Sequence, residues 1–219
     1  MRHGESVGNI GARTEDSSGY TLTAYGEKQA ALFAERLPNP PDLIVVSRYR
    51  RAQQTAAPCI ARFAAVPVEE WPVEEMHYLS RERTRQTTQI ERRALGRGFW
   101  DLSDPDFVEG EGAESFREFV ARADDALLRS RQRAESFIVI FAHSLFLRAV
   151  LWRALFGPQP IDGEAMKLYR EFSRGFDIPN CGHFRQLLTP DGDVFTGAIQ
   201  PLDATEPRPT AEQIQLSGL

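Results

Sequence analysis

The chain has 219 residues, and its content of 42% hydrophobic and 26% charged residues is that of an ordinary globular protein. This length fits one large domain or two small ones with a sizeable core, and the composition argues against a disordered, fibrous or coiled-coil class. The 26 Lys and Arg against 31 Asp and Glu give a net charge of -5, so no global positive field attracts nucleic acid or an anionic membrane. We therefore expect no nucleic-acid partner and no membrane association, and any anion site must be local.

The cysteines and the apolar stretches indicate a cytoplasmic protein. Cys59 and Cys181 lie far apart, show no CxxC spacing and cannot form a disulfide framework, which fits a reducing compartment. The longest apolar stretch, residues 137–156, is long enough to span a bilayer, but it carries Arg148 and Arg153, which are costly in hydrocarbon. This stretch is better explained as a strand, a turn and a helix.

The first half of the chain alternates amphipathic helices with short apolar strands. Apolar spacing predicts a helix over residues 23–37 and a second helix over 47–63. An apolar strand over 42–46 lies between them, and a possible strand follows at 66–71. This alternation suggests βαβ units. We expect residues 1–200 to form one α/β domain, a three-layer α/β/α sandwich with a mostly parallel sheet.

The pattern weakens between residues 77 and 112, where arginines come first and carboxylates later. We interpret this segment as a helical insertion or lid. Its arginines either form a solvated helix face that pairs with the acidic run, or contact the distal part of a ligand. The elements predicted after it are a helix over 116–127, a strand over 137–142, a helix over 144–156 and a hairpin of strands 183–188 and 194–199. Residues 201–219 are expected to form a disordered tail.

The segment Arg2-His3-Gly4-Glu5-Ser6, with Asn9, has the chemistry of a phosphate site. A guanidinium beside an imidazole suits a phosphate, and a glycine lets the backbone approach an anion closely. The segment resembles the opening motif of the histidine phosphatase superfamily, also called phosphoglycerate mutase-like. Later segments resemble further signatures of that family in the same order: Leu22–Ala30, Ser47–Ala56, Phe141–Ser144, and Asn180 with Cys181. The resemblance covers residues 2 to about 199.

The resemblance implies a role for each motif residue. The residues concerned are His3 and His143 for catalysis, Arg2, Arg51, Asn9 and Ser144 for phosphate binding, and Asn180 at the edge of the pocket. His3 would be the nucleophile, and Arg2, Arg51 and His143 would supply positive charge to the phosphoryl oxygens. His3 must then present an unprotonated nitrogen, so its other nitrogen is expected to donate to a carbonyl or carboxylate.

The general acid is expected among the carboxylates that follow residues 66–71. The position of Glu75 matches the carboxylate that the family uses, and Glu74 is the rival candidate. His77 could also lie close. The four histidines show no HxH or HExxH spacing, which makes a metal hydrolase improbable, and the scheme needs neither a metal nor a cofactor.

The motifs together predict a metal-independent phosphomonoester hydrolase that acts on a small-molecule substrate through a phosphohistidine on His3. Three other hypotheses stay open: a phosphomutase, a catalytically impaired relative that binds a phosphorylated ligand or partner, and an interaction protein that docks through its charged middle segment. The impaired relative is motivated by the start of the chain, because in the family a core strand precedes the motif and here only Met1 precedes Arg2. Either that strand lies upstream of the given start, which we favour, or the chain lacks it. Without it, the neighbouring sheet edges would be unpaired and His3 poorly held.

Overall fold

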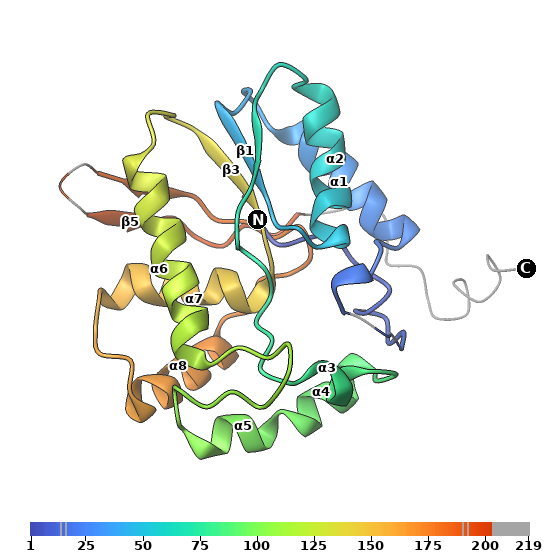
Figure 1. Ribbon diagram of the computed structural model, residues 1–219. Coiled ribbons are helices and arrows are strands. Elements are labelled where there is room, and N and C mark those ends of the chain that lie inside the picture. Colours follow the sequence, from blue (N-terminus) through green and yellow to red (C-terminus); the bar gives the residue numbers. More distant parts are fainter. Residues whose placement is uncertain (14, 16, 190, 192, 203–219) are drawn as a thin grey trace, which may run out of the picture.

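The computed structural model describes residues 1–13, 15, 17–189, 191 and 193–202 (Figure 1). After a short 3-10 helix at Ser17–Gly19, the helices are α1 Ala24–Arg36, α2 Arg50–Arg62, α3 Arg81–Thr84, α4 Gln89–Leu95, α5 Arg97–Leu102, α6 Phe116–Gln132, α7 Ser144–Phe156 and α8 Gly163–Gly175. The strands are β1 Leu43–Val46, β2 Val68–Glu70, β3 Ile138–Phe141, β4 Gln186–Leu188 and β5 Val194–Thr196. Every strand and helix expected from the sequence therefore has a counterpart. The expected tail lies outside the described residues from 203 onward.

The main sheet is parallel and has the order β2-β1-β3. Arg2 adds an isolated parallel bridge to Ala142, directly beyond the end of β3. The strand that the sequence analysis expects to be missing is thus represented by this single bridge. The antiparallel pair of β4 and β5 confirms the predicted hairpin, whose turn residues Pro190 and Gly192 lie outside the described part of the chain.

The sheet lies between two layers of helices. In β1, Leu43 and Val45 face the core beneath α6 and α7, whereas Ile44 and Val46 face the core beneath α1 and α2. All four side chains are buried, as the apolar run predicts. Figure 1 shows α1 and α2 on one side of β1 and β3, and α6 and α7 on the other. This arrangement confirms the predicted α/β fold.

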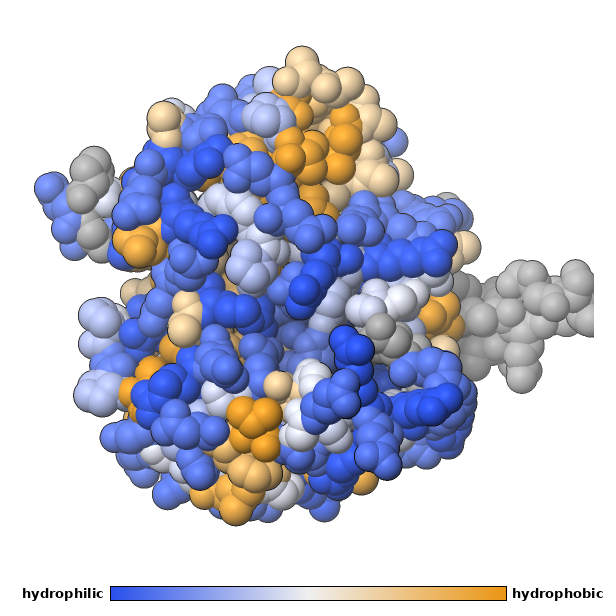
Figure 2. All heavy atoms as spheres, in the orientation of Figure 1, coloured by the Kyte–Doolittle hydropathy of each residue, from blue (hydrophilic) through white to orange (hydrophobic). Residues whose placement is uncertain are grey.

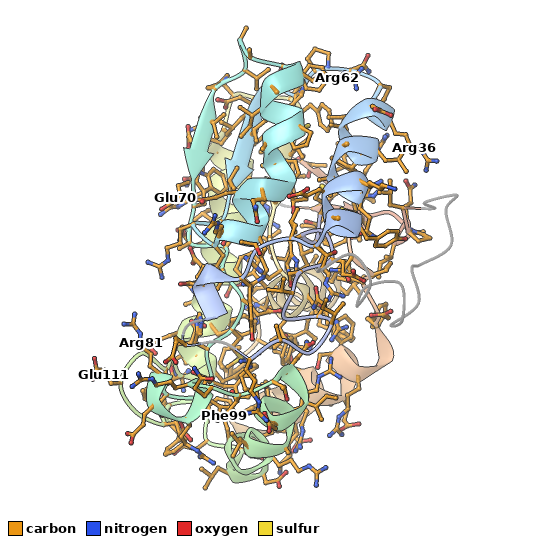
Figure 3. All side chains as sticks on the ribbon, turned by 90° about the vertical axis from the view of Figure 1, so that its right-hand side faces the viewer. Arg36, Arg62, Glu70, Arg81, Phe99 and Glu111 are labelled. Carbon is orange, nitrogen blue, oxygen red and sulfur yellow. The ribbon has the colours of Figure 1, made fainter. Side chains whose placement is uncertain are left out.

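The segment 77–112 packs onto the domain through aromatic side chains. Tyr78 and Phe99 have ring centroids 5.6 Å apart, and Trp100 stacks on Tyr169 of α8 at 6.1 Å. Figure 3 shows Arg81, Phe99 and Glu111 of this segment at one end of the molecule and Arg36 and Arg62 at the opposite end. The segment contains the helices α3, α4 and α5, and we refer to residues 77–112 as the insertion.

The sequence analysis does not predict helix α8. It begins after Asp162, whose Oδ1 accepts a hydrogen bond from the backbone of Ala165 at 2.9 Å. Its buried side chains, Met166 and Tyr169 among them, pack against α7 and α5. In the described part of the chain, no helix has the length and apolar character needed to cross a membrane.

Candidate active site

The backbone of His3 is held from both sides at the carboxyl end of the sheet. Its N–H donates to the carbonyl of Ala142 at 3.0 Å. Its carbonyl accepts from the backbone N–H of Cys181 at 3.2 Å and from Nδ2 of Asn180 at 3.1 Å. The expectation that His3 would be poorly held is therefore wrong: contacts distant in sequence replace those of a full strand.

The His3 ring is fixed in one tautomer. Its Nδ1 donates to the carbonyl of Gly4 at 2.7 Å, which leaves Nε2 with its lone pair. Burial, together with the positive charges of Arg51 and Arg2, holds the pKa of His3 well below its usual range. His3 is thus a neutral imidazole at neutral pH, and its free nitrogen is suited to act as a nucleophile.

The loop around His3 is tied to α1 and α2 by close contacts. The N–H of Gly4 donates to Oγ1 of Thr55 at 3.0 Å, and the N–H of Glu5 donates to Oε1 of Gln29 at 2.9 Å. A side chain at Gly26 would bring Cβ to 2.0 Å from the carbonyl oxygen of Glu5, so only glycine allows this approach. Sequence reasoning missed Thr55 and Gln29 as positioning residues, although both lie within the motif segments.

Arg2 and Arg51 line the same cleft as His3. Arg2 donates through Nη1 to the carbonyl of Ile178 at 2.7 Å, and its buried Nε has no hydrogen-bond partner among the described residues. Arg51 lies with its guanidinium 4.9 Å from the centre of the Tyr49 ring, and burial lowers its pKa to about 10. Arg51 therefore keeps its positive charge at neutral pH, and both arginines are placed to bind an anion in front of His3.

His143 lies directly behind His3, with the two ring centroids 5.1 Å apart. It is fully buried, and its Nε2 lies 2.9 Å from Oγ of Ser47. Its Nδ1 has no hydrogen-bond partner within the described part of the chain. Burial and the charge of Arg51 hold the pKa of His143 well below its usual range. His143 is thus neutral in the free site and offers a hydrogen bond, where the sequence analysis expects a positive charge.

Of the two adjacent carboxylates, Glu75 lies in the cleft that holds His3. Its Oε1 accepts from the backbone N–H groups of Leu145 at 2.8 Å and Phe146 at 3.3 Å, in the first turn of α7. These donors fix the carboxyl group, and the hydrogen bonds found for it among the described residues all use Oε1. Its Oε2 is therefore the oxygen left to exchange a proton with a ligand.

Glu74 lies on the other side of the chain, in a separate hollow of about 380 Å³. Its buried carboxylate contacts Arg48 at 3.2 Å and Arg122 at 3.7 Å. These ion pairs give Glu74 a structural environment away from the cleft. The structure thus brings Glu75 into the cleft with His3 and does not bring Glu74 there.

The remaining motif residues lie around the loop of His3. Asn9 and Ser144 line the cleft. The Nδ2 of Asn180 donates to the His3 carbonyl and to Oδ1 of Asn9, each at 3.1 Å. Oδ1 of Asn9 also accepts from the N–H of Ser6 at 3.0 Å. Asn180 and Asn9 therefore brace the loop.

Most of the residues that form this site lie in the part of the chain that matches a known protein family. The model of the histidine phosphatase superfamily, branch 1, matches residues 1–171. The chain belongs to this superfamily. The match confirms the resemblance drawn from the motifs at residues 2–9, 47–56 and 141–144.

Among histidine phosphatases, a metal-independent phosphoserine phosphatase from Arabidopsis thaliana is 30% identical over 159 residues. The match covers 70% of this chain and 66% of that protein, just under two thirds of its length. A phosphoserine phosphatase from Entamoeba histolytica, solved with 3-phosphoglyceric acid, has a TM-score of 0.67 at 18% identity and covers 92% of this chain and 95% of its own. The α-ribazole phosphatase from Shigella flexneri has a TM-score of 0.67 at 21% identity. The match covers 91% of this chain and 93% of that chain. These two structures share the fold.

The buried histidines of this histidine phosphatase site couple its stability to pH. The pKa values of His3 and His143 lie well below 6.5 in the folded chain. Below that pH the unfolded chain binds more protons than the folded chain, so stability present above pH 6.5 is lost as the pH falls. We expect the free energy of unfolding, from urea titrations, to drop between pH 7.5 and about 5.5 by about 1 kcal/mol for each buried histidine. The decline should be shallower in His143→Gln, and an equal decline would contradict a neutral His143.

Proposed function

We propose that the chain hydrolyses phosphomonoesters through a phosphohistidine on His3, without a metal ion. The observation that carries this proposal is the neutral His3 ring, locked onto the Gly4 carbonyl, with Nε2 free in a cleft lined by Arg2 and Arg51. Metal independence is supported by the name of the Arabidopsis relative. That name also makes phosphoserine the first natural substrate to assay.

In the first step, the lone pair of His3 Nε2 forms a P–N bond as the P–O bond to the alcohol breaks in line with it. Arg2 and Arg51 offset the charge on the non-bridging oxygens, and His143 offers a hydrogen bond behind them. Glu75, as a carboxylic acid, gives its proton to the departing oxygen. The products of this step are a free alcohol, a Glu75 carboxylate and phosphorylated His3.

In the second step, a water molecule replaces the alcohol. The Glu75 carboxylate accepts a proton from this water while its oxygen attacks phosphorus. The P–N bond breaks, and its electron pair returns to Nε2 of His3. Orthophosphate leaves, and both His3 and Glu75 regain their starting protonation states.

The test is turnover of 4-nitrophenyl phosphate in the presence of EDTA, with orthophosphate measured directly. Samples taken during turnover are quenched in alkaline denaturant, which preserves phosphohistidine, and digested for mass spectrometry. We expect turnover that is insensitive to EDTA and a phosphoryl group on the peptide that contains His3. Turnover that requires an added metal, or a phosphoryl group on another residue, would overturn the proposal.

The alternative functions make different predictions in the same assay. A catalytically impaired relative binds the ester without releasing orthophosphate. A phosphomutase forms the same phosphohistidine but returns the phosphoryl group to a sugar or acid acceptor, so isomerised ester exceeds orthophosphate. The hydrogen bonds to the His3 backbone from Ala142, Cys181 and Asn180 favour the hydrolase over the impaired relative.

A further inference from the structure

The cleft in front of His3 has a volume of about 890 Å³ and extends beyond the motif residues over the insertion and α8. Six further arginines line it: Arg92, Arg93 and Arg97 from α4 and α5, Arg148 from α7, and Arg170 and Arg174 from α8. Among the described residues that line the cleft, Glu75 and Asp177 are the carboxylates. Hydrophilic side chains dominate the face shown in Figure 2. A chain with a net charge of -5 thus concentrates positive charge in one cleft.

Three of these arginines have partners within the protein. Arg170 pairs with Asp101 at 2.7 Å, and Arg174 pairs with Glu171 at 2.6 Å. Arg92 donates to a neighbouring tyrosine hydroxyl at 2.7 Å. Arg170 and Arg174 thus have carboxylate partners, and Arg92 has a neutral hydrogen-bond partner.

The other three have little or no compensation. No ion pair or hydrogen bond joins the side chains of Arg93 and Arg97 to another described residue. Arg148 is only 17% exposed, and its buried Nε has no hydrogen-bond partner in the described part of the chain. Its ionic contact is to Asp177 at 3.6 Å, and that carboxylate is 83% exposed to solvent. Such a contact compensates a charge only weakly.

These cations lie close to the phosphoryl site. The charges of Arg148 and Arg93 both oppose protonation of Arg2 and contribute to lowering its pKa, after the larger effect of burial. Like charges gathered in one partly buried cleft repel each other, and a bound anion removes that repulsion. Arg2 and Arg51 already match the two charges of a phosphoryl dianion. A separate anion in the cleft could then pair with the largely buried Arg148 and with Arg93 and Arg97, whose exposed side chains are open to a ligand.

We propose that the substrate is a small molecule with a second anionic group, a carboxylate or a phosphate, which binds to Arg93, Arg97 and Arg148. This inference rests on the proposed phosphatase function and deepens it. The cleft is concave and its volume lies within the usual range for small-molecule sites of about 300–1,000 Å³. Guanidinium groups donate paired hydrogen bonds to carboxylates and to phosphates alike. Either anion therefore offers these arginines the same kind of oxygen acceptors.

The test uses substrates that differ only in the second group. Glycerol 3-phosphate is compared with 3-phosphoglycerate, which carries a carboxylate in place of a hydroxymethyl group. Fructose 6-phosphate is compared with fructose 1,6-bisphosphate, which carries a second phosphate. We expect kcat/KM to be higher for the doubly anionic member of at least one pair by about tenfold or more, and the pair that responds identifies the anion.

Single variants then assign the preference to the three arginines. In Arg93→Gln, Arg97→Gln and Arg148→Gln, the ratio of kcat/KM between the members of the responding pair should fall towards one. Arg36→Gln is the matched control, because Arg36 is an exposed arginine at the end of α1 opposite the insertion (Figure 3). This control should keep the wild-type ratio. Equal kcat/KM within both pairs, or a ratio that the cleft variants leave intact, would overturn the inference.

Binding measurements separate this inference from the proposed function. Calorimetric titration of the His3→Ala variant with the same four compounds needs no turnover. Tighter binding of the doubly anionic members supports the second anion site even if the wild-type chain hydrolyses none of the four. Equal binding within both pairs overturns the proposed second anion site. This holds even if all four compounds are hydrolysed, in which case the phosphatase function stands.

Discussion

The His3→Ala variant is expected to lose phosphatase turnover, with kcat lowered by about 10⁴-fold or more. The substitution removes the neutral ring whose Nε2 is the proposed nucleophile, so no phosphohistidine can form. Arg2 and Arg51 remain and still bind the dianion, so KM should change far less than kcat. Initial rates of 4-nitrophenyl phosphate hydrolysis in EDTA, over a range of substrate concentrations, measure both constants.

His183→Ala provides the matched control. His183 packs with its ring 5.3 Å from that of Phe33 and does not line the cleft, so its loss affects packing and not chemistry. This variant should keep wild-type kcat once the folded fraction is matched by circular dichroism. Imidazole added to the buffer should restore part of the activity of His3→Ala, because it can occupy the space of the lost ring. A similar loss of kcat in both variants would argue that His3 has only a structural role.

Most of the site could be predicted because its chemistry lies in short local segments. Arg51 lies in the first turn of α2, and His143 lies between β3 and α7. Arg2 and His3 stand together in one short motif, whose residue types themselves indicate an anion site. The protonation of His143 could not be predicted. It depends on complete burial and on the charge of Arg51, which comes from another part of the chain.

The firm hold on His3 was not visible in the sequence either. A short start before the motif suggests a loose segment, since few residues can pair locally. The hydrogen bonds that fix it come from Ala142, Cys181 and Asn180, which are more than 130 residues away. Long-range contacts of this kind follow from the topology, and no local pattern encodes them.

Helix α8 shows a different limit. Asp162 is a good N-cap, and Ala165, Met166 and Tyr169 have helical spacing, so the signal was present. Leu168, however, is 52% exposed on another face of the helix. An apolar residue outside the buried stripe blurs the amphipathic pattern, and the segment then resembles an irregular connection. Its importance for the site, through Arg170 and Arg174, depends on its docking against α5 and α7.

The Glu75→Gln variant is expected to lower kcat for an alkyl phosphate such as phosphoserine by about 10²–10⁴-fold. An amide can keep the hydrogen bonds from Leu145 and Phe146 but cannot give a proton to the alkoxide. The 4-nitrophenolate of an aryl ester leaves without a proton, so its hydrolysis should be affected much less in the first step. The ratio of the two losses, from parallel assays of both substrates, therefore measures proton donation separately from binding.

Glu74→Gln is the control at the neighbouring residue. It should lower stability, whereas Glu75→Gln should lower kcat. Glu74 contacts Arg48 and Arg122 outside the cleft, so its substitution leaves the exposed Arg48 and the largely buried Arg122 with a weaker acceptor. We expect a loss of about 1–3 kcal/mol in the free energy of unfolding, measured with urea, and wild-type kcat per folded molecule. The assignment of the general acid would pass to Glu74 if its variant showed the larger loss on phosphoserine. The comparison is made on the first turnover, before water attacks phosphorylated His3, because Glu75 serves as the base in that second step for either substrate. Equal losses in the first-turnover release of serine and 4-nitrophenolate would give Glu75 a role in binding, since only a proton donor discriminates between the two leaving groups.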